Sequence, residues 1–156
     1  METASDQLRS DEYWYGQTVP VGTGTWIHGI SQIVIGELLT EAGHIAGFSV
    51  ELRIIADARP KPDVIATKGA VEQPYPTKAV DVVVEILSPD ESMAFMIEKC
   101  RAYQAWGFRE IYVVDPGNRF VFRWTGGAFE ATNSLASVDA SRIWQRLDLA
   151  LGRKQA

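Results

Sequence analysis

The sequence of 156 residues is poor in cysteine, in long hydrophobic runs and in positive charge. Its single cysteine, Cys100, cannot form a disulfide within the chain, which is typical of proteins from a reducing compartment. No hydrophobic run approaches the roughly 20 residues that a membrane-spanning helix needs. The first residues lack the basic start and apolar stretch of a signal peptide. We therefore expect a cytoplasmic protein that does not enter a membrane.

Acidic residues outnumber basic residues by 20 to 15, which gives a formal net charge of −5. A tight, non-specific nucleic-acid binder needs an excess of Lys and Arg to contact phosphates, so this class is disfavoured. A nuclease is not excluded, because a bound divalent cation changes the charge of its own site. The chain is long enough for one domain with a real hydrophobic core.

Hydrophobic periodicity predicts a polar N-terminal segment and loop at 1–25 and one domain at 26–151. Residues 1–12 are polar and are expected to fray. The patterns predict helices and strands in the following order: a helix from 26 to near Gly43, strands at 48–55, 63–67 and 79–87, a helix ending at Gly107, strands at 110–114, 120–124 and 129–132, and a helix at 138–151. This order predicts an α/β fold with a mixed β-sheet flanked by helices.

Two carboxylates lie in strand-like, otherwise apolar surroundings. Asp63 follows Pro62 at the start of one predicted strand, and Glu85 lies within the next. A buried carboxylate costs free energy unless something compensates its charge, so two of them suggest a shared cation. Magnesium often takes one or two carboxylates, with water and substrate phosphate completing its shell. A plainer interpretation places Asp63 in a turn and Glu85 at a strand end near solvent.

Lys99 lies on the helix that follows Glu85, and its distance from the acids depends on where this helix begins. Residues 88–91 have the form of a capping box, which would place Lys99 roughly 16 Å along the helix and leave it as a surface residue. If residues 88–93 form a loop instead, the helix begins near Ala94 and Lys99 lies in its second turn. The lysine could then orient a nucleophile or neutralise negative charge.

Several blocks of sequence resemble the Uma-two family of restriction endonuclease-like proteins, within the PD-(D/E)-X-K nuclease superfamily. The resemblance covers roughly residues 26–150, and the blocks that carry it are 62–64, 83–89, Lys99 with Tyr103, and 107–116. It implies an α/β fold with a restriction-endonuclease-like core. It also implies that Asp63 and Glu85 match the metal-binding acids of the superfamily.

The same resemblance gives Lys99 the place of a lysine that has moved from the strand to the following helix. Leu87 occupies the strand position, so the strict E-X-K form is absent. Members often carry an acid four residues before the helix lysine, where this chain has Phe95. The N-terminal strand pair of the family is expected to be shortened or replaced by residues 19–25.

His28 and Glu37, at the start and in the middle of the first predicted helix, are candidate accessory residues. His28 could contact substrate or orient an acid, and Glu37 could supply a further acid, as in some nucleases. A histidine at a helix start is also typical of a cap or a surface group. An acid on a helix is equally typical of an exposed side chain.

We therefore expect a hydrolase that uses Mg²⁺ or Mn²⁺ to cleave phosphodiester bonds, a DNA endonuclease with Asp63, Glu85 and Lys99 as catalytic residues. Asp63 and Glu85 are expected to hold the metal. An alternative is a catalytically inactive nuclease-fold module for nucleic-acid binding or assembly, which the acidic charge and Phe95 favour. A third interpretation is a structural oligomer with an interface formed by the aromatic residues of 120–124. Because this hairpin is expected to be exposed, a homodimer is expected under each interpretation.

Overall fold

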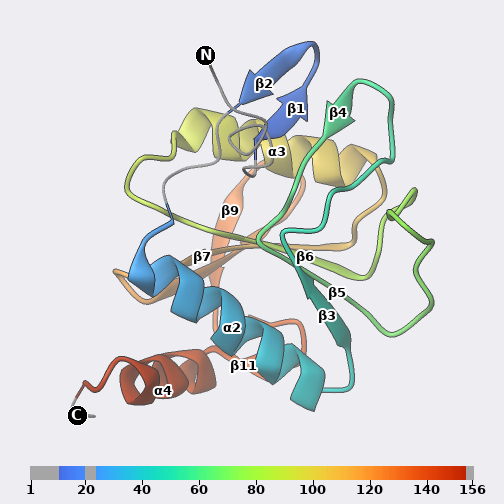
Figure 1. Cartoon of the computed structure of the whole chain (residues 1–156). Helices are drawn as coiled ribbons and strands as arrows, with labels where there is room; N and C mark the ends of the chain where they lie inside the picture. The colour runs from blue at the N-terminus through green and yellow to red at the C-terminus, as the bar shows by residue number, and fades with distance from the viewer. Residues whose placement is uncertain (1–10, 20–23, 154–156) are drawn as a thin grey trace, which may run out of the picture.

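The computed structural model describes residues 11–19 and 24–153, which form a six-stranded mixed sheet flanked by three helices (Figure 1). The helices are α2 (Trp26–Glu41), α3 (Met93–Ala105) and α4 (Ala140–Ala150). The strand order across the sheet is β3 (Ile45–Phe48), β5 (Val64–Thr67), β6 (Val82–Ile86), β7 (Glu110–Asp115), β8 (Phe120–Trp124) and β9 (Phe129–Thr132). β6 and β7 are parallel and the other neighbours are antiparallel. The predicted α/β fold with a mixed sheet is confirmed.

The two faces of the sheet are covered by different helices, with α3 on one side and α2 and α4 on the other (Figure 1). Successive side chains of a strand point to opposite faces. Val64, Val82 and Val84 pack in one core cluster with residues of α2 and α4. Ile65 and Val83 pack in a second cluster with residues of α3. Odd-numbered positions of β5 and β6 therefore face α3.

A small three-stranded sheet lies beside α3, in the order β2 (Gln17–Val19), β1 (Glu12–Trp14) and β4 (Ala58–Arg59). Of the segment 19–25, which we expected to replace or shorten the N-terminal strand pair of the family, residue 19 ends β2 and residues 20–23 lie outside the described part of the chain. Gly16, with φ of +86°, provides the tight turn between β1 and β2. Residue 12, which we expected to be frayed, is part of β1.

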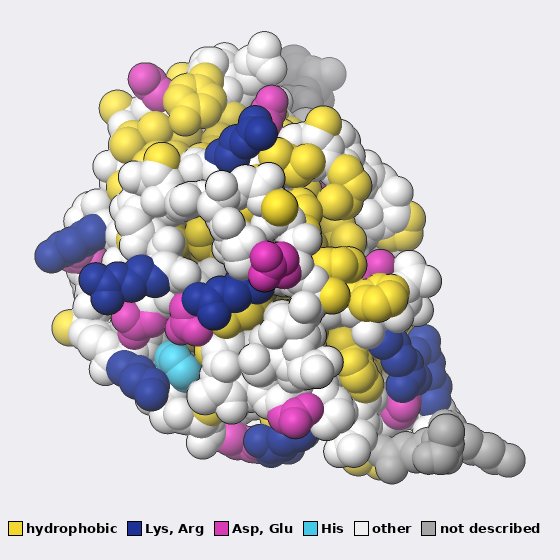
Figure 2. Space-filling view, turned by 180° about the vertical axis from the view of Figure 1, so that it is seen from behind, with side chains coloured by type: hydrophobic (Ala, Val, Ile, Leu, Met, Phe, Trp, Pro, Cys, Tyr) yellow, Lys and Arg dark blue, Asp and Glu magenta, His cyan; other side chains and the backbone are white. Residues whose placement is uncertain are grey.

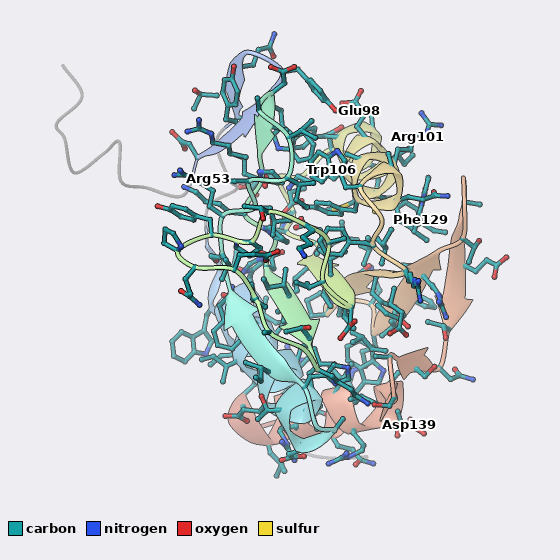
Figure 3. All side chains as sticks on the ribbon, turned by 90° about the vertical axis from the view of Figure 1, so that its right-hand side faces the viewer. Arg53, Glu98, Arg101, Trp106, Phe129 and Asp139 are labelled. Carbon is teal, nitrogen blue, oxygen red and sulfur yellow. The ribbon has the colours of Figure 1, made fainter. Side chains whose placement is uncertain are left out.

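Aromatic packing fixes the small sheet to α3. Trp14 of β1 stacks on Trp106, just beyond α3, with ring centroids 5.8 Å apart. It also lies edge-on against Phe95 of α3, again with centroids 5.8 Å apart. Figure 3 shows Trp106 between the small sheet and α3. Such contacts add to the burial of large apolar surfaces and hold β1 in a defined place.

Two predicted element boundaries differ from the structure. The strand expected at 48–55 is wrong, because β3 ends at Phe48 and Ser49 takes a positive φ of 51° that turns the chain out of the sheet. The alternation seen there arises because Leu52 is buried between more exposed neighbours. The terminal helix begins two residues later than expected, because Val138–Asp139 forms β11, which pairs with β10 (Ser134–Leu135).

The helix predicted from residue 26 is confirmed as α2, and the strands predicted around 63–67, 79–87, 110–114, 120–124 and 129–132 are confirmed as β5 to β9. Trp124 is buried and donates to Gln104 at 2.7 Å, so it belongs to the core of the chain itself. Phe120, in contrast, is 48% exposed. Within the described residues, no helix is both long and apolar enough to cross a membrane.

The core packing leads to a first prediction. Leu39 of α2 is fully buried, whereas Leu149 of α4 is 70% exposed. Leu39→Ala should lower the free energy of unfolding by about 2–5 kcal/mol, because it removes apolar contacts and leaves a cavity. Leu149→Ala should change it by less than about 0.5 kcal/mol. Urea denaturation measures both values, and equal losses in the two variants would contradict the packing described here.

Candidate active site

Asp63 and Glu85 lie opposite one another at neighbouring strands. β5 and β6 pair with Val64 against Val84 and Ile65 against Val83, and extending this register by one residue places Asp63 against Glu85. Opposed residues of antiparallel strands project on the same side, with Cβ atoms about 4.5–5.5 Å apart. The two residues are only 6% and 2% exposed. The interpretation that leaves Glu85 at a strand end near solvent is therefore wrong.

Two neighbours fix the orientation of the Asp63 carboxylate. Oδ2 accepts the backbone N–H of Ile86 at 2.7 Å, and Oδ1 lies 3.2 Å from Nε2 of His28. The hydrogen bond with Asp63 raises the pKa of His28, although burial of the ring opposes it. His28 lies at the start of α2, where Thr25 caps the helix by accepting the His28 backbone N–H. Of the two accessory candidates, His28 is therefore in contact with a candidate site residue.

α3 begins at Met93, with Ser92 as its N-cap, so the loop arrangement predicted for residues 88–93 is confirmed. Ser88 does bond to Glu91, as a capping box would suggest, but this bond joins their side chains within the loop. Lys99 consequently lies in the second turn of α3, with only 5% of its surface exposed. The lysine is held inside the molecule, next to the strand that carries Glu85.

The Lys99 ammonium contacts two buried carboxylates. Nζ lies 2.7 Å from Oε1 of Glu12 and 3.8 Å from Oε1 of Glu85. Burial lowers the pKa of Lys99, but the charges of Glu85 and Glu12 outweigh burial, and the pKa is raised above its ordinary value. Lys99 therefore remains a cation throughout the neutral pH range.

Tyr103 contributes a further contact to Glu85. Its hydroxyl donates to Glu85 Oε1 at 2.6 Å, and the side chain is fully buried. Lys99 and Tyr103 are four residues apart on α3, so both project from the same helix face. Burial raises the pKa of the Glu85 carboxyl well above its ordinary value. Lys99 opposes this shift, while the charges of Asp63 and Glu12 add to it.

Glu12 is a site residue that the sequence analysis missed. It is 2% exposed on β1, and its Oε2 accepts the backbone N–H of Lys61 at 2.7 Å while Oε1 contacts Lys99. We had assigned residues 1–12 to a frayed segment because their composition is polar. A signal was present, since Glu12 and Trp14 occupy alternate positions in an aromatic stretch that ends at Gly16.

Glu91, in the loop before α3, also lies near the site. Its Oε1 accepts from Ser88 Oγ at 3.0 Å, whereas its Oε2 is buried and has no hydrogen-bond partner among the described residues. Burial raises the pKa of Glu91, Lys99 opposes this shift, and Asp63 adds to it. Sequence reasoning treated Glu91 as a helix-capping residue, and its proximity to the acids depends on the path of the loop.

Glu37, the second accessory candidate, is not brought to this site. Its side chain is 57% exposed and lies 3.9 Å from Arg146 of α4. Position 37 is two and a half helical turns beyond His28, which places the two residues on opposite sides of α2. The geometry of α2 therefore separates the two accessory candidates.

The donor set fits a hard divalent cation of the magnesium type. The site holds three buried carboxylates, those of Glu12, Asp63 and Glu85. Its cationic groups are at most two, the Lys99 ammonium and a protonated His28, so acidic groups are in excess. Within residues 11–19 and 24–153, no group of three or more His, Cys, Asp or Glu side chains is arranged to hold a metal. A two-carboxylate site is sufficient for magnesium, because water and substrate phosphate complete its shell.

Solved structures show where else this fold occurs. The crystal structure of a putative nuclease belonging to DUF820 from Anabaena variabilis ATCC 29413 has a TM-score of 0.69. Its sequence is 17% identical, and the match covers 88% of this chain and 90% of that chain, which shows a shared fold. A cryo-EM structure of a DrdV–DNA complex is similar with a TM-score of 0.44 and 14% identity, over 80% of this chain and 11% of the other.

No functionally curated protein matches the sequence. A family model described as "Uma2: Putative restriction endonuclease" matches residues 4–151, which is nearly the whole chain. The match confirms the resemblance that the sequence blocks indicated, and it supports a nuclease-type function. The chain belongs to the Uma2 family of restriction endonuclease-like proteins.

Proposed function

We propose that this protein is a phosphodiester hydrolase that uses Mg²⁺ or Mn²⁺ to cleave DNA. The observation that carries the proposal is the convergence of Asp63 and Glu85 on the α3 face of the sheet, with the Lys99 ammonium 3.8 Å from Glu85. The family match supports a nuclease-type function for the chain. Asp63 and Glu85 are the residues that would hold the cation, and Lys99 is the third catalytic residue.

Each site residue has a separate role in this proposal. A divalent cation would supply positive charge to the reacting phosphate and make water a stronger nucleophile. The Ile86 N–H and His28 keep the Asp63 carboxylate in one orientation. Because the pKa of Lys99 is raised, its side chain stays protonated at neutral pH and cannot act as a general base. Lys99 instead orients the attacking water or stabilises negative charge on the phosphate.

The electrostatics of the metal-free site support cation binding. Burial raises the pKa of Glu85 well above its ordinary value, because the buried site disfavours an uncompensated negative charge. Binding of a cation would favour the ionised carboxylate, as is general for carboxylate ligands. The site therefore costs the fold stability unless a cation or a proton is present.

The alternative, a catalytically inactive nuclease-fold module, has two observations in its favour. Lys99 gives its shorter contact to Glu12, and the strand position of the E-X-K pattern is Leu87. A module that binds DNA through phosphate contacts would need a basic surface. On the face seen in Figure 2, basic and acidic side chains lie side by side across the middle of the molecule. This mixture disfavours a module that binds DNA through positive charge on that face.

A homodimer is a further part of the proposal. Phe120 is 48% exposed, and its ring stacks on Phe122 with centroids 5.6 Å apart, which offers an aromatic surface to a second copy. Trp124 belongs to the core and is left out of this surface. The molar mass in solution, measured by analytical ultracentrifugation, distinguishes a dimer from the 17.3 kDa monomer.

A prediction concerns the pH dependence of stability in chelator-treated, metal-free protein. The pKa of Glu85 is higher in the native state than in the unfolded state. At pH values between these two pKa values, the native state therefore binds more protons than the unfolded state. Stability should therefore fall as pH rises through this window, by at most about 1.4 kcal/mol per pH unit. Glu85→Gln should remove this part of the slope, so its stability relative to wild type should increase with pH.

Urea denaturation between pH 5 and pH 8 measures this difference. Glu98→Gln is the matched control, because Glu98 is exposed on the same helix that covers the site, as Figure 3 shows. Its pH slope should equal that of the wild type. A Glu85→Gln variant with the wild-type slope would contradict the shifted pKa.

Another prediction concerns metal binding and cleavage. At a cation concentration about 100-fold above Kd, Mg²⁺ or Mn²⁺ should stabilise the wild type by about 2.7 kcal/mol, which raises Tm by roughly 5–10 °C. Asp63→Asn and Glu85→Gln should abolish this rise, because each removes one of the two charged ligands. Differential scanning fluorimetry with and without EDTA measures the shift.

The same variants should lose metal-dependent nicking of supercoiled plasmid DNA by at least about 100-fold, and Lys99→Met should do so without losing the metal-induced rise in Tm. Glu37→Gln serves as the control, because it removes an acid from α2 that lies away from the site. A wild type with no metal response and no nicking would overturn the proposal. DNA retention without cleavage would identify the inactive binding module.

A further inference from the structure

We propose that Glu12 is a positioning residue that holds Lys99 away from Glu85 and so keeps the Glu85 carboxylate available to the cation. This inference rests on the proposed function, because it assigns Glu85 to a metal. The central observation is the unequal sharing of one ammonium between two buried carboxylates. Lys99 Nζ is 2.7 Å from Glu12 and 3.8 Å from Glu85.

Glu12 is itself held by the segment that carries Asp63, the second acid proposed to hold the cation. Its Oε2 accepts the backbone N–H of Lys61, two residues before Asp63, at 2.7 Å. Its Oε1 is thereby directed to Lys99, and both residues are almost fully buried. One carboxylate thus connects β1, the start of β5 and α3.

The composition of α3 explains why the carboxylate that pairs with Lys99 comes from strand β1 and not from α3 itself. One helical turn before Lys99, the chain has Phe95, whose ring centroid lies 5.0 Å from Nζ. An acid at this position could hold the lysine from within its own helix, but a phenyl ring offers only a weak cation–π contact. Trp14 packs edge-on against the same Phe95 ring. Since Glu12 and Trp14 share one side of β1, this aromatic contact brings Glu12 to Lys99.

Loss of the Glu12 charge would change the partner of Lys99. A buried ammonium without a counter-charge is strongly unfavourable, and Glu85 is the other carboxylate within ion-pair distance. Lys99 would then neutralise Glu85 and compete with the cation for it. Glu12 therefore separates the two charges that the proposed reaction uses.

The test is a double-mutant cycle of Glu12→Gln, Lys99→Met and their combination. The two oxygens of the Glu12 carboxylate face different donors, Oε2 the Lys61 N–H and Oε1 the Lys99 ammonium, whereas the amide of Gln would turn an NH2 group toward one of them. In a metal-free crystal structure of Glu12→Gln, Lys99 Nζ should lie within about 3 Å of Glu85. Isothermal titration calorimetry should show that Mn²⁺ binds about 10-fold more weakly to Glu12→Gln than to the wild type.

In the Lys99→Met background, Glu12→Gln should leave the Mn²⁺ affinity unchanged, because the competing ammonium is gone. A merely structural role of Glu12 would weaken binding equally in both backgrounds, and this outcome would overturn the inference. The inference would also be overturned if, in the crystal structure of Glu12→Gln, Lys99 Nζ stayed beside the side chain of residue 12. Glu98→Gln, next to Lys99 but exposed, is the control and should change neither the structure of the site nor the affinity.

Two outcomes separate this inference from the proposed function. If the wild type binds no Mn²⁺, the proposed function fails, and the crystal structure of Glu12→Gln alone decides whether Glu12 sets the position of Lys99. If Glu12→Gln does not fold, Glu12→Asp takes its place, since it keeps the charge but withdraws the carboxylate by one methylene group. The same displacement of Nζ toward Glu85 is then expected, and its absence would contradict the inference.

Discussion

The register between β5 and β6 is the constraint on which the rest of the candidate site depends. It sets Asp63 against Glu85 on the face of the sheet that α3 covers. A shift of β5 by one residue would turn the Asp63 carboxylate away from Glu85 and into the valine-rich core beneath α2 and α4. The hydrophobic alternation of the two strands therefore fixes the position of the acids as well as the core. Packing and chemistry are specified by the same pattern of residues.

Burying several charged groups under α3 costs desolvation free energy, which hydrogen bonds and ion pairs to neighbouring groups offset. Isolated carboxylates would not be stable in this environment, but each has a defined partner: an N–H of β6 for Asp63, a tyrosine hydroxyl for Glu85, and a lysine for Glu12. Such pairs seldom add net stability, because desolvation consumes most of the attraction. Their value lies in orientation, since a site that is held in place before the ligand arrives loses little entropy when it binds. The apolar clusters on both faces of the sheet provide the stability that this arrangement requires.

Much of this fold follows from local patterns in the sequence. The strands from β5 to β9 and helix α2 were predictable because their periodicity and turn residues agree with their tertiary surroundings. Asp63 and Glu85 were identifiable because acids are unusual in such apolar strands. Glu12 was not, because it lies in a segment whose overall composition is polar and whose burial depends on Trp14 packing against α3. The loop at 88–91 was ambiguous for a related reason. Its capping signal is real and forms a bond between Ser88 and Glu91, yet only the position of α3 on the sheet decides where the helix begins.

A lysine on the helix in place of one on the strand, the role proposed for Lys99, has a simple geometric explanation. Position 87 is two residues beyond Glu85, so a side chain there points to the same face of the sheet. Here that position is Leu87, which packs in the cluster beneath α3. Because α3 covers this face, a lysine that points inward from the helix reaches the same space from the opposite direction. The two positions therefore bring an ammonium to the same carboxylate by different routes. In this chain the helix lysine also contacts a second buried acid, Glu12, which the N-terminal strand β1 provides.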